Sequence, residues 1–282
     1  MRKISFLKQF ITQIILTIVG LFVILPIWGM ARLAFDGSLK GRPTEFRFLP
    51  KIWSFDAFIQ VLDKPYQSVD FEVLLKNSLL VSFGAALIAI LLGMSLAYAF
   101  ARFRFPGRQT GLFGLLLAAI LPPVAFMTPL YILLSLIHIR TTLLGLVITY
   151  AIFAMPFCIW NMRAAFQAIP KEIEEAAFLD GAGDFTTFLF VTLPLALPSI
   201  AVAGLIAFLM AYSEFALGWV FVEKAETVTL AMSIYAMTQS GGGAQPWSYL
   251  GSLTIIMSIP VVIIFLIFQR TLLERMMFGD AT

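Results

Sequence analysis

The chain has 282 residues, of which 60% are hydrophobic and 12% are charged, and its formal net charge is +3. Soluble domains are typically about 45–50% apolar, so this composition excludes an ordinary soluble protein and indicates a membrane protein. The single cysteine, Cys158, excludes a disulfide within the chain, and the single histidine, His138, excludes a metal or catalytic site built from several histidines.

Six apolar runs are long enough to cross a membrane as helices, which takes about 20 residues each. Backbone groups in lipid must be hydrogen-bonded within their own segment, so the sequence predicts an all-α membrane bundle in a single domain, 1–282. The predicted spans are 10–30, 79–100, 112–136, 143–162, 199–222 and 249–268.

The first span is preceded by Arg2, Lys3 and Lys8, as in a signal peptide, but it is long and lacks a small-x-small cleavage site. We therefore interpret it as an uncleaved anchor. With both termini in the cytoplasm, the basic residues divide almost equally between the two sides. The short loops favour this orientation, because 101–110 carries three basic residues and 137–142 carries one. The net charge gives no reason to expect nucleic acid as a partner.

A polar segment, 34–71, follows the first span. It predicts an external loop with a short surface helix within 52–62, which either forms a solvated cap or docks a partner. The second span is preceded by Lys76-Asn77-Ser78, and Asn77 is a candidate residue of a translocation pathway.

Proline interrupts the third span at Pro122-Pro123 and again at Pro129. Proline removes a helical hydrogen bond and kinks the helix, and kinked membrane helices often line cavities that open and close. Pro122 is therefore a candidate pathway residue, although proline is also common in ordinary membrane helices. His138 is interpreted as an interfacial polar residue without a function.

The longest polar interruption in the second half of the chain is 168–198. Pro170 suits the first turn of a helix, and the three glutamates that follow it lie where the helix dipole favours negative charge. Gly181 is placed to end this helix, because glycine takes the left-handed conformation without strain.

Asp184 is a suitable N-cap for a second short helix, 185–190, which is expected to end before Pro194 and Pro198. The composition of the whole interruption is also typical of an amphipathic helix that lies on the membrane surface.

A string of fixed spacing favours a more specific role. Glu175-Ala176-Ala177 is followed by three residues, Gly181, nine residues and Val191-Thr192-Leu193-Pro194. This string resembles the signature loop of the membrane subunits of binding-protein-dependent ABC importers: E-A-A, three residues, G, nine residues, I-x-L-P. The one departure is Val191 in place of Ile. The resemblance extends over most of the chain and is closest to the carbohydrate-type permeases, in particular the smaller membrane subunit of maltose-type transporters.

The resemblance implies that this stretch is a cytoplasmic coupling helix, which docks in a groove of an ATPase subunit and passes its motion to the pore. Small side chains would allow close approach, and the acidic ones would pair with basic residues of the groove. The implied coupling residues are Glu175, Ala176, Ala177, Asp180, Gly181, Ala182 and Gly183.

The resemblance also implies a prokaryotic inner membrane, cytoplasmic termini and three kinds of partner. These are a second homologous permease subunit in a pseudo-twofold heterodimer, two ATPase subunits that hold ATP and magnesium, and an external solute-binding protein that delivers an oligosaccharide or disaccharide. The sequence contains no G-x-x-x-x-G-K-[ST] phosphate-binding loop. We therefore expect no cofactor in this chain, and a transport subunit rather than an enzyme.

The predicted fifth span contains the one acidic residue found within an apolar run, in Tyr212-Ser213-Glu214. A carboxylate in hydrocarbon is costly unless it is paired, protonated or facing water. Tyr212, Ser213 and Glu214 are therefore candidate pathway residues that face a cavity or a subunit interface. Alternatively, Glu214 lies near the outer interface and pairs with a neighbouring helix.

Between the fifth and sixth spans, Gly241, Gly242 and Gly243 predict a mobile, uncharged loop. By analogy with maltose-like permeases the loop contacts the binding protein; a plain connector is the alternative.

Two other functions fit the sequence. The chain could be an ABC permease for a polyol, a glycerophosphodiester or a peptide, because the signature loop faces the ATPase and not the solute. It could also be a secondary transporter that uses Glu214 as a proton- or cation-coupling site.

Overall fold

The protein is described by a computed structural model over residues 6–39, 41–239 and 246–278. In these ranges the chain is helical with connecting loops, and it contains isolated β-bridges but no β-strand, which confirms the all-α prediction. The α-helices are α1 (Phe6–Ala34), α2 (Asp56–Asp63), α3 (Phe71–Arg102), α4 (Arg108–Ile120), α5 (Met127–Leu136), α6 (Leu143–Ala168), α7 (Lys171–Leu179), α8 (Asp184–Thr187), α9 (Leu193–Ser213), α10 (Ala216–Phe221), α11 (Leu230–Gln239) and α12 (Trp247–Phe278). Short 3₁₀ turns occur at η1 (Pro123–Phe126) and η3 (Ala225–Thr227), and a π-turn occurs at η2 (Phe188–Thr192).

The chain divides into two compact units. One unit comprises Met1–Phe71 and Ile234–Ile259, and the other comprises Glu72–Ser233 and Pro260–Thr282. The expectation of a single domain stays a prediction, and each unit is described by itself below.

In the first unit, α12 packs closely against the end of α1. A Cβ atom added to Gly251 would lie 2.8 Å from the backbone nitrogen of Ala34, so only glycine allows this approach. The Ser252 hydroxyl donates to the Ala34 carbonyl at 3.4 Å. The predicted short surface helix is present as α2, and the ring of its Phe58 packs on Phe35 with centroids 4.9 Å apart.

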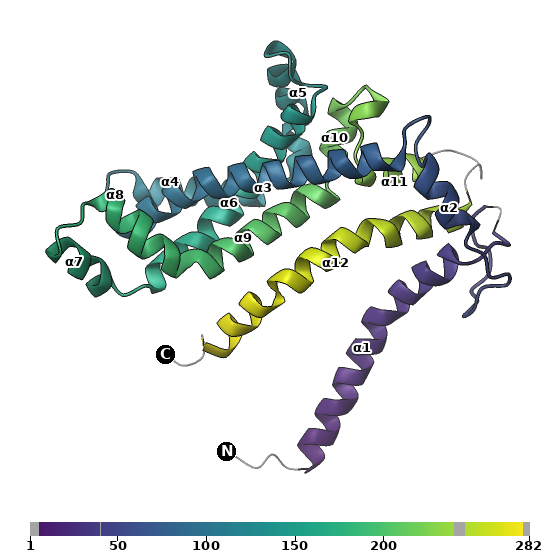
Figure 1. Cartoon of the computed structure of the whole chain (residues 1–282), viewed down its shortest axis with the longest axis horizontal. Helices are drawn as coiled ribbons and strands as arrows, with labels where there is room; N and C mark the ends of the chain where they lie inside the picture. The colour runs from purple at the N-terminus through teal and green to yellow at the C-terminus, as the bar shows by residue number, and fades with distance from the viewer. Residues whose placement is uncertain (1–5, 40, 240–245, 279–282) are drawn as a thin grey trace. The chain divides into compact units, whose positions relative to one another are not determined.

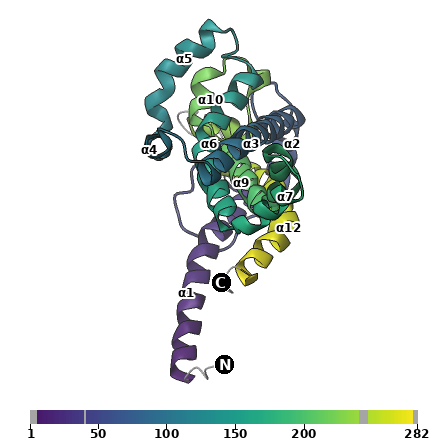
Figure 2. The ribbon, with the colours of Figure 1, turned by 90° about the vertical axis from the view of Figure 1, so that its left-hand side faces the viewer.

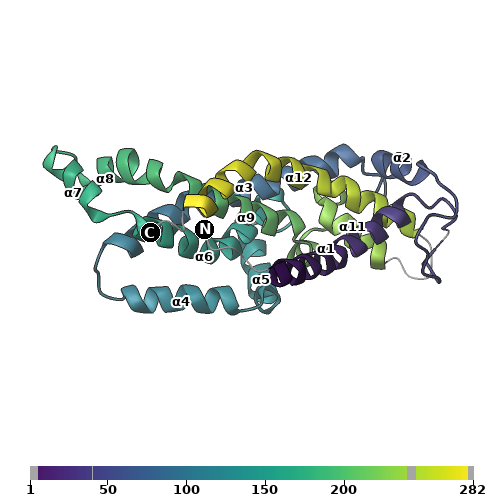
Figure 3. The ribbon, with the colours of Figure 1, turned by 90° about the horizontal axis from the view of Figure 1, so that it is seen from below.

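In the second unit, α6 and α9 pack along each other, and α4 runs beside α6 (Figure 3). α7 and α8 lie at one end of these long helices, while α10 and the start of α11 lie at the other end (Figure 1). Figure 2 shows the unit from the α7 end. The two ends therefore offer two separate places for function.

The described residues include five helices that are long and apolar enough to cross a membrane, and a bent helix pair that would make a sixth. The third predicted span is this pair, Arg108–Ile120 and Pro123–Leu136, with a bend of 101° rather than a kink. The physical cause is the double proline. Leu121 and Pro122 each precede a proline, which disfavours helical backbone, and both are extended with ψ near 130°.

Candidate functional site

The predicted coupling helix exists as α7, and it begins directly after Pro170. Pro170 is the N-cap and not a residue of the first turn, because its backbone is extended with ψ 136°. Glu172 and Glu174 lie in the first turn, where their charge is favourable to the helix dipole.

α7 ends at a glycine in the left-handed conformation, as predicted. Gly181 has φ +91°, and its N–H donates to the Phe178 carbonyl at 3.0 Å. The N–H of Ala182 donates to the Ala177 carbonyl, also at 3.0 Å. These two bonds form a Schellman motif, which satisfies the last carbonyls of the helix and turns the chain sharply.

Glu174 is the one buried residue of α7, all of which is described. Its carboxylate forms an ion pair with Arg102 at the end of α3, with 2.8 Å between Nε and Oε2, and the two side chains are only 8% and 7% exposed. The Thr192 hydroxyl donates to Oε1 at 2.7 Å. Arg102 also donates from Nη2 to the carbonyl of Ile169, the C-cap of α6, at 2.9 Å. We call Arg102, Glu174 and Thr192 the buried triad.

An aromatic cluster lies one helical turn away from the triad. Tyr98 precedes Arg102 by four residues on α3, and Phe188 precedes Thr192 by four residues on the π-turn. Their rings are 4.6 Å apart, and Phe166 of α6 packs edge-on to Tyr98 at 5.6 Å. The cluster adds apolar packing between the same helices that the triad joins.

The rest of α7 and the turn after it face outward. Of the predicted coupling residues, Ala177 and Ala182 are half-buried, and the exposed ones are Glu175, Ala176, Asp180, Gly181 and Gly183. Apolar side chains stand out among these charges, because Leu179 is 90% exposed and Phe185 is 74% exposed. We call Leu179, Gly181 and Phe185 the coupling tip. An apolar tip rimmed by charge is typical of a surface that a protein partner covers.

The segment after the tip differs from the prediction of a short helix that ends before Pro194. Asp184–Ser213 is one continuous helical run, and it contains the π-turn. Pro194 has no N–H to donate, so the regular helical ladder is interrupted there. The N–H of Leu193 bonds instead to the Phe188 carbonyl, five residues back.

At the opposite end of the unit, the fifth span ends at Ser213 and does not continue to residue 222. Glu214 explains the end, because its carboxylate accepts hydrogen bonds from the backbone N–H groups of Leu217 (2.9 Å) and Gly218 (3.3 Å) in the first turn of α10. Glu214 is half-buried, Tyr212 is buried, and Ser213 is exposed with its hydroxyl bonded to the Leu209 carbonyl. The structure thus gives Glu214 a capping role, and its pathway role stays a prediction.

The helix break at Pro122 leads to the same place. η1, which follows Pro122, and α5 both contact α10, which follows Glu214. Interrupted helices at membrane depth are tolerated where they are buried in protein or line a cavity. The structure therefore brings two predicted pathway segments together, although they are far apart in the sequence.

Asn77 lies elsewhere on α3 and has a structural contact. Its side-chain amide is buried and donates to the carbonyls of Glu226 (2.7 Å) and Val228 (2.9 Å), which fixes the loop before α11. Gly241, Gly242 and Gly243 lie outside the described residues, so the prediction about their loop stays as it was. Among the described residues, no group of three His, Cys, Asp or Glu side chains could hold a metal ion.

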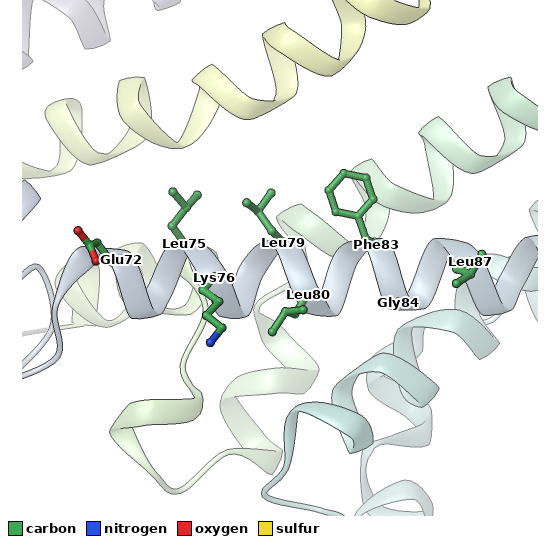
Figure 4. A pocket seen from close by; sticks show the side chains of 8 residues that line it. All are labelled: Glu72, Leu75, Lys76, Leu79, Leu80, Phe83, Gly84 and Leu87. Carbon is green, nitrogen blue, oxygen red and sulfur yellow. The ribbon is translucent and has the colours of Figure 1, made fainter.

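An apolar groove of about 560 Å³ runs along one side of α3 (Figure 4). Its polar groups are confined to Glu72 and Lys76 near one end, and leucines and Phe83 line the rest. Such a lining suits lipid chains or another helix, and it lacks the polar groups that a sugar requires.

Sequence reasoning missed the buried triad. Three glutamates follow Pro170 within six residues, and nothing in the local pattern distinguishes Glu174 from Glu172 and Glu175. Arg102 lies 72 residues earlier, in a basic turn that is typical of membrane anchoring. Its 7% exposed side chain cannot reach lipid headgroups. Only the tertiary packing of α7 on α3 identifies the pair.

Comparison with known proteins places the chain in a family. Residues 71–278 match the family described as "Binding-protein-dependent transport system inner membrane component". The trehalose transport system permease protein SugB of Mycobacterium tuberculosis is 30% identical over 87% of this chain and 89% of its own length. The maltodextrin transport system permease protein MdxG of Bacillus subtilis is 25% identical over 97% of this chain and 96% of its own.

A solved structure shares the fold. A chain of a bacterial ABC transporter involved in the import of the acidic polysaccharide alginate superposes with a TM-score of 0.75. It is 22% identical, and the match covers 96% of this chain and 99% of that one.

Proposed function

Because this chain belongs to the family of binding-protein-dependent transport system inner membrane components, we propose that it is the membrane-spanning permease subunit of an ATP-driven sugar importer. The names of the trehalose and maltodextrin relatives support a sugar over a polyol, a glycerophosphodiester or a peptide. The chain is a transport subunit, and its proposed role is to carry a di- or oligosaccharide that an external binding protein delivers.

The proposed partners follow the family arrangement. They are a second, homologous permease subunit in a heterodimer, two ATPase subunits that bind ATP and magnesium, and the external binding protein. The proposed orientation places both termini in the cytoplasm, and α7 with them. The family description names an inner membrane, and we propose that of a prokaryotic cell.

The observation that carries the proposal is the shape of the coupling tip. Leu179 and Phe185 project from a tight glycine turn, and Glu175, Asp180 and Asp184 surround them with negative charge. An ATPase groove with an apolar floor and a basic rim would bury the two apolar side chains and pair with the carboxylates. Burial of one leucine or phenylalanine side chain contributes about 1.5–3 kcal/mol. Two of them would hold α7 in the ATPase groove firmly enough to move with it.

Transport would then follow by alternating access. Closure of the ATPase pair on ATP would move the docked α7, and α9 would carry the movement to the region of Glu214, α10 and the break at Pro122. With 21 residues at about 1.5 Å each, α9 alone is about 32 Å long, which matches the hydrocarbon thickness of a bilayer. The tip and the pathway would thus lie at opposite membrane faces.

The test separates ATP-driven import from a secondary transporter that uses Glu214. The complex is reconstituted in vesicles with the binding protein, and sugar uptake is measured with ATP on the cytoplasmic side. We expect uptake to stop when ATP is withdrawn and to continue when an uncoupler removes the proton gradient. Uptake that persists without ATP and stops with the uncoupler would contradict the proposal.

A further inference from the structure

The chain between α7 and α9 is a poor carrier of force. It passes through the glycine turn at Gly181, the four-residue α8 and the π-turn, where the regular hydrogen-bond ladder is interrupted. π-turns and glycine turns are places where a helical chain bends. A push on the coupling tip would therefore bend this connection before it moved α9.

A second route bypasses that connection. The Glu174 carboxylate bonds directly to the hydroxyl of Thr192, the last residue of the π-turn, immediately before α9 begins. The same carboxylate holds the Arg102 guanidinium at the end of α3, and Arg102 holds the Ile169 carbonyl at the end of α6. One side chain of α7 thus fastens the ends of α3 and α9 directly, and the end of α6 through Arg102.

We propose that Glu174 is the positioning residue through which α7 moves the membrane helices, with Arg102 and Thr192 as its two attachments. The inference rests on the docking of α7 described above, but it concerns the inner side of α7 and not the side that faces the ATPase. We call the proposed role of the buried triad the joint, because the triad connects α7 to the membrane helices. The coupling tip is the part of α7 on which the ATPase subunit would act.

The chemistry of the triad suits a joint. Apolar contacts are non-directional and allow one helix to slide on another, whereas a charged hydrogen bond fixes both distance and angle. The triad is buried and lies beside the Tyr98–Phe188 cluster, so water competes little for its hydrogen bonds. The other residues of α7 are not buried, so α7 has no comparable apolar anchor.

The experiment measures sugar imported per ATP hydrolysed, in vesicles that contain the complete complex. Thr192→Val removes the hydroxyl that bonds to Glu174 and to Tyr98 but keeps the ion pair, and we expect the ratio to fall about fivefold. Thr192→Ser keeps the hydroxyl and should restore a normal ratio. Glu174→Gln removes the charge that Arg102 requires and should lower the ratio by more than Thr192→Val does. Glu172→Gln, on the exposed side of the same turn, is the matched control and should leave the ratio unchanged.

The amount of assembled complex is measured in parallel, because Glu174→Gln leaves the buried Arg102 charge without its counter-charge and can lower folding yield. A lower yield with a normal ratio in the remaining complex would show a merely structural triad and overturn the proposal. Normal ratios in both Thr192→Val and Glu174→Gln would also overturn it.

Docking is read out separately. In a variant whose buried Cys158 is replaced by alanine, Leu179→Cys is treated with a thiol-to-amine cross-linker. Cross-links to the ATPase subunit, together with a reduced ratio in Thr192→Val, support both docking and the joint. Absence of the cross-link would contradict the proposed docking, and the joint with it, whereas a cross-link with a normal ratio would contradict the joint alone.

Discussion

At Gly181 the predicted signature string calls for glycine, and the backbone conformation favours glycine as well. Its φ of +91° costs other L-residues about 1–2 kcal/mol, with asparagine the best tolerated replacement. A Cβ atom at Gly181 would meet nothing within 4 Å, so the cost is conformational and not steric within this chain. The glycine therefore shapes the turn that presents Leu179 and Phe185.

We predict that Gly181→Val reduces sugar uptake by about tenfold or more, because the strained turn displaces the tip, and leaves the ATP affinity of the ATPase subunits unchanged. Gly181→Asn should retain most of the uptake. Uptake is measured in vesicles at equal amounts of permease, and ATP affinity is measured by equilibrium binding. Normal uptake by Gly181→Val would contradict the prediction.

Gly183 provides the control for close approach. Its backbone is extended, with φ −82° and ψ 168°, and a Cβ atom there also meets nothing within 4 Å of this chain. Gly183→Ala therefore adds a methyl group without strain. A loss of uptake in this variant would indicate a tight fit to the ATPase, whereas normal uptake beside an inactive Gly181→Val would assign the requirement to the turn alone.

At the scale of elements, the sequence predicts the helices well and their ends less well. The length of an apolar run determines whether a helix can cross the membrane, so α3, α6 and α12 appear where predicted. The predicted end of the fifth span, residue 222, was wrong, because the sequence stays apolar beyond Ser213, where the helix ends. The helix ends because the Glu214 carboxylate caps α10, the next helix. The length of an apolar run does not predict such a cap.

The coupling region divides in the same way. The helix end at Gly181 could be predicted from the sequence, because glycine ends helices by a local conformational rule. The burial of Glu174 could not be predicted from the sequence. It depends on how α7 is rotated relative to Arg102, which lies 72 residues earlier in the chain. The sequence predicts which residues form α7 and its glycine turn, and only the fold separates the exposed side of α7 from the side that is attached to Arg102 and Thr192.

Pro194 gives a prediction at the same scale. Pro194→Ala restores an N–H donor and allows the π-turn to become regular α-helix. Loss of the extra residue per turn would rotate α8 relative to α9 by roughly 100° and pull Thr192 away from Glu174. We expect the thermal unfolding temperature to stay equal or rise while uptake falls about fivefold. Unchanged uptake in a correctly folded variant would contradict the prediction.

At the scale of the whole molecule, the chain exposes more apolar surface than one subunit needs. No residue in the membrane-spanning part of α1 is buried, and many large apolar residues of α3 and of α12 up to residue 267 are exposed. Lipid covers such surface in the membrane, whereas we propose that an ATPase subunit covers the coupling tip, whose apolar side chains stand among charged ones. A substitution at the tip should therefore affect a partner outside the bilayer and spare a partner within it.

The last prediction uses that distinction. Leu179→Asn should weaken co-purification of the ATPase subunits about tenfold or more, because a buried leucine at an interface contributes about 1.5–3 kcal/mol. The second permease subunit should still co-purify, since its contacts are expected in the membrane. Leu136→Asn is the matched control, because Leu136 is likewise well exposed but lies on α5, away from the α7 end of the unit (Figure 1). Retention of the ATPase subunits by Leu179→Asn, or their equal loss in Leu136→Asn, would contradict docking at the tip.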